Sequence, residues 1–195
     1  MSEMPSQPTL ILIAGGPGAG KTTLGRALAA QFETGVLLDK DVINSAWVDQ
    51  MLIRLNDGQV DRESQIYLEA LRPLEYGALL AAAFDNLALG KTVFVVAPFG
   101  PELTDGDWVR RLQHSVQELG GRVRAIWIET DEQTAKERIT ARRSPRDAWK
   151  LANWDGFAAS AQFIPPREDL LVLRSNGQSA MADLVNKAII YLCLK

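Results

Sequence analysis

Short apolar runs alternate along the chain with longer segments that carry apolar residues at helical spacing. The runs are rich in Val, Ile and Leu and nearly continuous in apolar character, which is typical of strands buried on both faces of a parallel sheet. Five such runs predict strands at Leu10–Gly15, Val36–Asp39, Thr92–Pro98, Arg124–Thr130 and Leu170–Ser175.

The segments between the predicted strands favour helices. Pro73 interrupts one of them and indicates a kink or a break, and the pair Gly120-Gly121 ends another. We expect helices over residues 21–32, 41–55, 65–89, 108–119, 131–143 and 180–193. Strands that alternate with helices predict an α/β fold with right-handed crossovers.

Composition narrows the class of protein. The 195 residues suffice for one domain, and the net charge of −3 gives no general attraction to nucleic acid or anionic membranes. The single cysteine, Cys193, excludes an internal disulfide framework. The first eight residues, MSEMPSQP, lack the features of a signal peptide, and no apolar run reaches the ~18 residues that span a bilayer. We therefore expect a cytoplasmic protein in which residues 1–8 form a mobile leader.

A glycine-rich loop follows the first predicted strand and precedes the first predicted helix. Its sequence, GGPGAGKT, fits the pattern GxxxxGK[ST]. Glycines let backbone amides approach phosphates closely, and the start of a helix adds its positive dipole end. Lys21 places a charge against the β- and γ-phosphates, and the hydroxyl of Thr22 suits Mg²⁺. The predicted nucleotide-binding residues are Gly15, Gly16, Pro17, Gly18, Ala19, Gly20, Lys21, Thr22 and Thr23.

A glycine-rich loop of this pattern is called a P-loop. Two features of the sequence restrict the class of P-loop protein to which the chain can belong. The Asn-Lys-x-Asp motif with which guanine-specific switch proteins read the base does not occur in the sequence. The third predicted strand ends in VVAPF, so that Ala97 occupies the position where a Walker B aspartate often lies. A metal ion must then be organised by another residue, or be held by Thr22, the phosphates and water.

Three segments of the sequence resemble a group of small P-loop kinases related to zeta toxins, polynucleotide kinases, chloramphenicol phosphotransferases and gluconate kinases. The segments are GGPGAGKTTLGRALA, LLDKDVI and ERITARRSPRDAWKLANWDGF. The resemblance implies a three-layer P-loop NTPase fold with a five-stranded parallel sheet in the order 2-3-1-4-5. It also implies that residues 9–195 form one kinase domain, with an arginine-bearing lid around residues 138–157.

The same resemblance implies roles for the residues that follow the second strand. Asp41 matches the general base that accepts the proton of the substrate hydroxyl. Asp39 is a candidate, with Thr22, for the metal site, where it would hold a magnesium-bound water. Lys40, between the two aspartates, is expected to touch the substrate or to lie in solvent. A helix N-cap with a solvated neighbour is the structural alternative for the two aspartates.

The densest basic run of the chain includes Arg138, Arg142 and Arg146. The first two are four residues apart and share one helical face. The resemblance implies a lid that closes over ATP, excludes water and brings guanidinium groups onto the phosphates. We predict that Arg138 and Arg142 are catalytic, together with Lys21 and Asp41, and that Arg146 binds the nucleotide. The alternative is a solvated helix in which the arginines pair with Glu132 and Glu137.

These observations predict an ATP- and Mg²⁺-dependent kinase that phosphorylates a hydroxyl group of a small molecule, with no membrane partner. The loop Pro98-Phe99-Gly100 is expected near the acceptor. A polynucleotide 5′-kinase would need a basic channel with stacking aromatic residues, which the net charge disfavours. A non-catalytic nucleotide-binding regulator stays open because the Walker B acid is missing. The sequence also leaves open the identity of the acceptor, the choice of ATP over GTP, and the oligomeric state.

Overall fold

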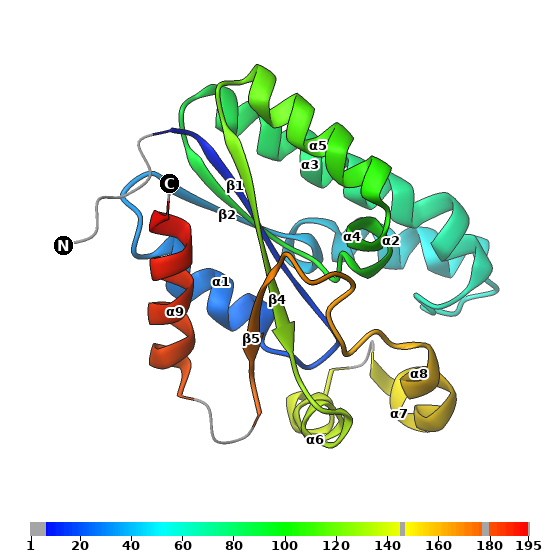
Figure 1. Cartoon of the computed structure of the whole chain (residues 1–195). Helices are drawn as coiled ribbons and strands as arrows, with labels where there is room; N and C mark the ends of the chain where they lie inside the picture. The colour runs from blue at the N-terminus through cyan, green and yellow to red at the C-terminus, as the bar shows by residue number, and fades with distance from the viewer. Residues whose placement is uncertain (1–6, 145–146, 177–179, 195) are drawn as a thin grey trace.

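A five-stranded parallel sheet forms the centre of the computed structural model, which describes residues 7–144, 147–176 and 180–194 (Figure 1). The strands are β1 (Thr9–Gly15), β2 (Gly35–Asp39), β3 (Thr92–Val96), β4 (Arg122–Glu129) and β5 (Leu171–Arg174). They lie in the order β2-β3-β1-β4-β5, and every neighbouring pair is parallel. The predicted α/β class and the strand order implied by the resemblance are both confirmed.

Helices cover both faces of the sheet, as strands that are apolar on both sides require. One face carries α1 (Lys21–Ala29) and α9 (Met181–Cys193), and the other carries α3 (Arg72–Ala88) and α5 (Gly106–Glu118) (Figure 1). Along β1, Ile11 belongs to the apolar layer under α1 and α9, whereas Leu10 belongs to the layer under α3 and α5. Both side chains are completely buried. Successive side chains of β1 point to opposite faces of the sheet, so the strand contributes to the apolar layer on each face.

A smaller helical unit lies beside the sheet and consists of α2 (Lys40–Leu55) and a π-helical turn, η1 (Tyr67–Leu71). The two elements share a separate apolar cluster that includes Val48 and Tyr67. We predicted one helical stretch over 65–89 with a break or kink at Pro73. In the structure the helical stretch is unbroken there: η1 ends at Leu71 and α3 begins at the next residue, and the N–H of Arg72 donates to the carbonyl of Tyr67, so a π-helical turn directly precedes Pro73.

The predicted lid, around residues 138–157, runs from the second half of α6 (Glu132–Arg142) through α7 (Ala148–Ala152) into α8 (Trp154–Ser160). Ile139 from α6 and Trp154 from α8 meet in a fourth apolar cluster, which holds these short helices together. Neither α7 nor α8 was predicted, and α4 (Gly100–Thr104) was expected to be loop. Each of these helices has five to seven residues, which is too short to show a helical period in the sequence.

Parallel strands bring the candidate residues to one edge of the sheet. The glycine-rich loop follows β1, Asp39 ends β2, and Pro98 lies just after β3. The helices α6, α7 and α8 lie at the same edge (Figure 1). Within the described part of the chain, no helix is long and apolar enough to cross a membrane.

Candidate active site

The glycine-rich loop takes a backbone conformation that side chains would disturb. Gly15, Gly18 and Gly20 have φ angles of 142°, 71° and 95°. A Cβ at Gly18 would also lie 2.8 Å from the carbonyl oxygen of Ala135 in α6, and one at Gly15 would collide with the carbonyl of Ile128 in β4. The loop therefore packs directly on backbone of the strand and helix beside it, and only glycine fits at these positions.

Lys21 folds back over this loop. Its Nζ donates hydrogen bonds to the carbonyl oxygens of Gly15, at 2.9 Å, and Gly16, at 2.7 Å. Burial lowers the pKa of Lys21 to about 8, against the opposing effect of the Asp41 carboxylate, and the cations Lys150 and Arg142 lower it further. The positive charges of Lys150 and Arg142 thus act on Lys21, so an anion bound beside Lys21 would relieve this repulsion.

Thr22 and Asp39 form a pair of oxygen ligands beside the loop. The Thr22 hydroxyl donates to Oδ2 of Asp39 at 2.7 Å, and Oδ1 of Asp39 accepts the backbone N–H of Asp41 at 2.9 Å. Asp39 is thus both the N-cap of α2 and the partner of Thr22. Hydroxyl and carboxylate oxygens suit Mg²⁺, and the described residues contain no cluster of three or more His, Cys, Asp or Glu side chains that would hold a metal ion alone.

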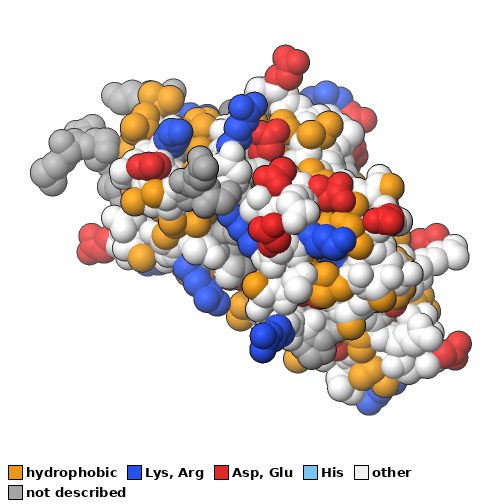
Figure 2. Space-filling view, turned by 90° about the horizontal axis from the view of Figure 1, so that it is seen from below, with side chains coloured by type: hydrophobic (Ala, Val, Ile, Leu, Met, Phe, Trp, Pro, Cys, Tyr) orange, Lys and Arg blue, Asp and Glu red, His pale blue; other side chains and the backbone are white. Residues whose placement is uncertain are grey.

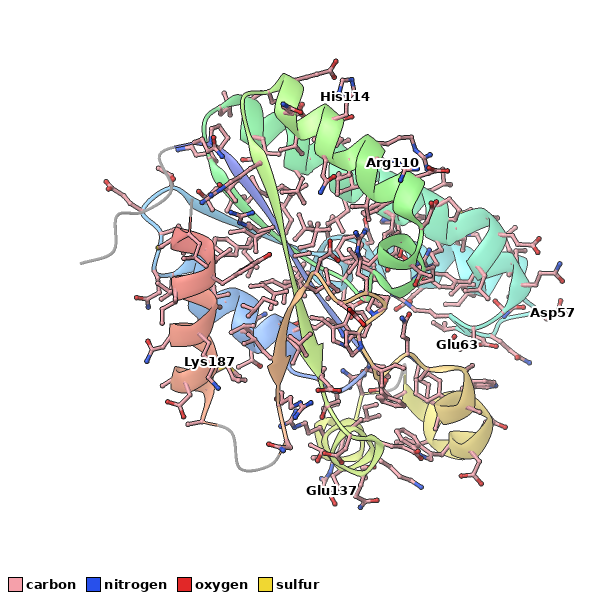
Figure 3. The ribbon with its side chains drawn as sticks, viewed as in Figure 1. Asp57, Glu63, Arg110, His114, Glu137 and Lys187 are labelled. Carbon is pink, nitrogen blue, oxygen red and sulfur yellow. The ribbon has the colours of Figure 1, made fainter. Side chains whose placement is uncertain are left out.

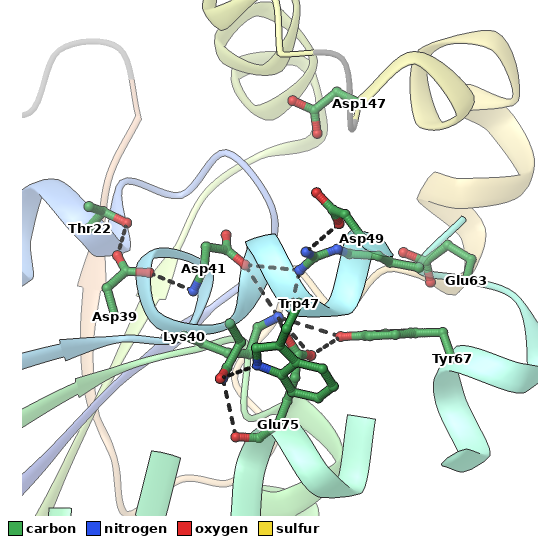
Figure 4. Close-up of polar contacts among 12 residues, drawn as sticks. Thr22, Asp39, Lys40, Asp41, Trp47, Asp49, Glu63, Tyr67, Glu75 and Asp147 are labelled. Atoms are coloured by element: carbon green, nitrogen blue, oxygen red, sulfur yellow. Dashed lines mark hydrogen bonds and ion pairs between the residues drawn. The ribbon is translucent and has the colours of Figure 1, made fainter. Parts of the chain in front are cut away.

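Asp41 lies in the first turn of α2 among cations (Figure 4). Its Oδ1 is 3.2 Å from Nζ of Lys40 and 3.5 Å from Nη1 of Arg62, and its side chain is 39 % exposed. The structural alternative was that one aspartate only caps the helix and the other lies in solvent. Asp39 does cap α2 but also pairs with Thr22, and Asp41 contacts Lys40 and Arg62 instead of lying free in solvent. The solvated alternative for Lys40 was wrong: the chain turns into α2 directly after Asp39, and Lys40 is buried.

Arg138 and Arg142, the two predicted catalytic arginines of the lid, have different partners. Arg138 donates from Nη1 to the carbonyl of Gly18, at 3.2 Å, and to Oγ of Ser175, at 3.1 Å, so it ties the glycine-rich loop to the end of β5. Arg142 forms a two-pronged ion pair with the buried carboxylate of Asp147. Arg146, which we predicted to bind the nucleotide, lies outside the described residues.

The segment after α8 returns to the same edge and touches two loops. A Cβ at Gly16 would lie 2.9 Å from the carbonyl oxygen of Gln162, and a Cβ at Gly100 would collide with the carboxamide oxygen of the same residue. Gln162 thus lies between the glycine-rich loop and the loop after β3. The backbone also joins these loops, because the N–H of Gly15 donates to the carbonyl of Pro98 at 3.3 Å.

The family to which the chain belongs follows from one comparison. The model of the AAA_33 family, described as an AAA domain, matches residues 10–164. This range runs from β1 to the segment after α8, and so includes the glycine-rich loop, both aspartates and the lid. The chain belongs to the AAA_33 family. A search of curated proteins finds none that matches this AAA_33 protein.

Solved structures share the fold of this AAA_33 protein. A Chloroflexus aurantiacus protein, provisionally assigned as a kinase, has a TM-score of 0.64 and 22 % identity, with 97 % of this chain and 100 % of that one covered. A gluconokinase from Sinorhizobium meliloti 1021 has a TM-score of 0.56 and 15 % identity, over 97 % of this chain and 93 % of its own. The Mycobacterium tuberculosis APS kinase, solved with AMPPNP and APS, has a TM-score of 0.53 and 16 % identity, over 96 % of this chain and 98 % of its own. The resemblance to small P-loop kinases is thereby confirmed, at identities that show the fold alone.

Three residues of this AAA_33 site were not predicted. Arg62 and Gln162 gave no signal, because a lone arginine in a polar loop and a glutamine after a helix have no local pattern. Lys150 falls inside the predicted lid range but was passed over, since the resemblance concerned arginines. Its Nζ lies 3.5 Å from Oε1 of Glu63 and 4.9 Å from the ring centre of Phe157. Glu63 is on the side of its loop that faces α7 and α8, so this ion pair joins the lid to the helical unit of α2 and η1 (Figure 3).

Proposed function

We propose that this protein is an ATP- and Mg²⁺-dependent kinase that transfers the γ-phosphate to a hydroxyl group of a small molecule. The observation that carries the proposal is the position of Asp41. Its carboxylate lies at the same sheet edge as the P-loop, close enough to Lys21 to oppose the fall in that residue's pKa. A carboxylate beside a phosphate-binding lysine suits a general base that accepts the proton of an attacking hydroxyl.

The other residues of the edge supply charge and position. We assign phosphate binding to the backbone amides of residues 15–22 and to Lys21, and stabilisation of the transferring group to Arg138 and Arg142. Thr22 and Asp39 would hold Mg²⁺ through their oxygen atoms, and the ion supplies further positive charge to the phosphates. The named functions of the gluconokinase and the APS kinase, two proteins of the same fold, support a small-molecule acceptor.

The surface supports a small acceptor over a polynucleotide. On the face seen from below, Lys and Arg side chains are interspersed with Asp and Glu side chains (Figure 2). Charges of both signs also lie close together near Asp41, where Arg62 pairs with Asp49 and Lys150 pairs with Glu63. A nucleic-acid backbone is bound through many unpaired cations, which makes binding strongly dependent on salt. The paired charges beside Asp41 suit a compact, neutral or singly charged acceptor instead.

Acceptor-dependent release of ADP tests the proposal. A library of sugars, sugar acids, nucleosides and amino alcohols is screened with the wild-type protein, MgATP and a coupled ADP assay. We expect at least one compound to raise ADP release at least tenfold over the rate in water. Asp41→Asn should lose that stimulation while it still binds MgATP, and Lys21→Ala should lose MgATP binding itself.

The matched control is Asp57→Asn, which makes the same change on an exposed turn far from the P-loop (Figure 3). Asn tolerates the left-handed conformation of residue 57, whose φ is 48°, so this variant should fold and react like the wild type. Full stimulation in Asp41→Asn would overturn the assignment of the base. If no compound in the library stimulated a folded protein that binds MgATP, the kinase proposal would give way to a nucleotide-binding regulator.

A further inference from the structure

Lys150 lies on the lid and reaches across to the unit that carries the proposed base. It belongs to the short helix α7, and its Nζ lies 3.5 Å from Oε1 of Glu63, in the loop between α2 and η1. Arg62, the residue before Glu63, lies 3.5 Å from Oδ1 of Asp41. The ion pair of Lys150 and Glu63 therefore connects the lid to the surroundings of Asp41.

The lid that carries Lys150 packs on the P-loop (Figure 1). A Cβ at Gly18 would lie 2.8 Å from the carbonyl oxygen of Ala135 in α6, so loop and helix are in direct contact. Asp147, the residue that precedes α7, is buried and pairs with Arg142 at the end of α6. The helix that bears Lys150 is thereby fixed to the helix that contacts the P-loop.

The contacts of the Lys150 ammonium group are weak. Its distance of 3.5 Å from Glu63 exceeds the about 2.7–2.9 Å of a strong charge-assisted hydrogen bond, and the ring centre of Phe157 lies 4.9 Å away. Both side chains of the ion pair are partly exposed, at 21 % for Lys150 and 35 % for Glu63. Exposed ion pairs contribute little to stability, so the ammonium group can exchange its partner readily.

The charge of Lys150 also acts on the P-loop. Lys150 and Arg142 both lower the pKa of Lys21, and Lys150 does so more strongly. Of these two lid cations, the lysine thus has the greater electrostatic effect at the phosphate-binding residue, although only the arginine was predicted from the sequence. In the nucleotide-free protein, Glu63 offsets the repulsion between the two lysines.

We propose that Lys150 is a further phosphate-binding residue of the lid, which leaves Glu63 for an oxygen of the γ-phosphate when MgATP occupies the P-loop. The inference rests on the proposed function in placing the triphosphate against Lys21. A triphosphate carries several negative charges and Glu63 carries one, so the phosphate is the stronger partner. The flexible four-carbon stem of lysine allows the exchange without a change in α7 itself.

The alternative role is a latch, in which the ion pair only fastens the lid to the loop between α2 and η1. The two roles predict different signs. A latch is broken by the loss of either partner, so Lys150→Met and Glu63→Gln would have the same effect on nucleotide affinity. A phosphate-binding lysine is removed by the first substitution and released by the second, so the two effects should be opposite.

Calorimetric titration with the Mg²⁺ complexes of ADP and of AMPPNP, a non-hydrolysable ATP analogue, distinguishes the roles without an acceptor. We expect Lys150→Met to weaken MgAMPPNP binding by about tenfold and MgADP binding by less than about twofold, because ADP lacks the γ-phosphate. Glu63→Gln should tighten MgAMPPNP binding by about threefold or more, because Lys150 no longer has to leave a carboxylate. The double variant should bind as weakly as Lys150→Met, since it has no lysine to release.

Control variants make the same changes away from the site. Lys187→Met removes an exposed lysine of α9 (Figure 3), and Glu118→Gln removes an exposed carboxylate at the end of α5. Both should bind the two nucleotides as the wild type does. Lys150→Arg keeps the positive charge and should retain MgAMPPNP affinity within about threefold, which tests the role of the charge even if Lys150→Met fails to fold.

The two proposals fail differently. Equal loss of MgAMPPNP affinity in Lys150→Met and Glu63→Gln, or unchanged affinity in a folded Lys150→Met protein, would overturn phosphate binding by Lys150. Either result would leave the kinase proposal standing. A failed acceptor screen would overturn the kinase proposal and leave the role of Lys150 to the titrations, which need no acceptor. A folded wild-type protein that bound neither nucleotide would overturn both.

Discussion

The hydroxyl of Thr22 donates a hydrogen bond to Oδ2 of Asp39 across 2.7 Å, while Oδ1 of the same carboxylate caps α2 through the backbone N–H of Asp41. One side chain therefore connects the P-loop helix to the helix that carries the proposed base. Oδ1 caps the helix and Oδ2 faces the proposed metal site. A substitution that keeps the cap but removes the negative charge therefore distinguishes the two roles.

Asp39→Asn is that substitution. Asparagine retains an oxygen that can cap α2 nearly as well as aspartate, so we expect the free energy of unfolding to fall by less than about 1 kcal/mol. It loses the negative charge beside Thr22, so affinity for MgATP should fall by about tenfold or more, whereas affinity for ATP in EDTA should not fall. Calorimetric titration with and without Mg²⁺ measures both affinities.

Asp105→Asn is the control for the cap. Asp105 caps α5 by accepting the N–H groups of Asp107 and Trp108, and it is exposed and remote from the P-loop. It should show a similar small loss of stability and unchanged affinity for MgATP. An Asp39→Asn protein that bound MgATP as tightly as the wild type would remove Asp39 from the metal site.

Lys21 gives nucleotide binding a defined pH dependence. Burial lowers its pKa to about 8, from an ordinary value of 10.5, and bound phosphates should raise it again. Below pH 8 the free protein already holds the proton. Above pH 8 the proton has to be taken up on binding, so the dissociation constant of MgATP should rise by up to about tenfold per pH unit.

Calorimetry in two buffers of different ionisation enthalpy counts these protons. We expect little uptake from Lys21 at pH 7.5 and an approach to one proton at pH 9. Lys21→Arg, whose guanidinium stays charged at both values, should take up none. Equal affinity at pH 7.5 and pH 9, without proton uptake, would contradict the lowered pKa.

The lid arginines should differ in their effect on nucleotide affinity. Arg138 also contacts Gly18 and Ser175, so Arg138→Ala should lower kcat and, in addition, loosen the P-loop and weaken MgATP binding by about tenfold. Arg142 is 37 % exposed and paired with Asp147, so Arg142→Ala should lower kcat by about tenfold or more and change MgATP affinity less. Steady-state kinetics with the acceptor, together with direct nucleotide titration, separate the two effects.

Arg142→Ala also leaves the buried Asp147 carboxylate without its partner, which destabilises the lid for a reason unrelated to catalysis. The double variant Arg142→Met/Asp147→Asn removes both charges. If Arg142 acts on the phosphates, the double variant should recover thermal stability and not kcat. Recovery of both would reduce Arg142 to a structural role.

The parts of the fold predicted from sequence are those that local chemistry determines. Continuous apolar runs located all five strands, because strands buried on both faces tolerate few polar residues. Strand β3 is two residues shorter than predicted, because it ends at Val96 rather than at Pro98. Beyond Val96 the chain leaves the sheet toward Phe99, which has a left-handed φ of 52°.

The parts that could not be predicted depend on contacts between distant residues. Lys40 has an ordinary sequence context, and its burial is decided by Glu75, 35 residues away. The contact of Gln162 with the P-loop likewise depends on how the chain returns from α8. Because pairings of this kind have no periodicity and no motif, they are not readable from the sequence, whereas the loop that binds phosphate is.

Glycines at three positions should respond differently to alanine, according to what a Cβ would meet. At Gly16 it would lie 2.9 Å from the backbone carbonyl of Gln162, which cannot turn aside, so Gly16→Ala should displace the segment after α8 and weaken MgATP binding. At Gly100 it would meet the flexible end of the Gln162 side chain, so Gly100→Ala should cost less, and Gln162→Ala should rescue it. At Gly77, in the middle of α3, it would meet nothing within 4 Å, so Gly77→Ala should stabilise the protein by about 0.5–1 kcal/mol. Denaturant unfolding and nucleotide titration of the four variants measure these effects, and a Gly16→Ala protein with unchanged affinity would show that the segment after α8 does not support the P-loop.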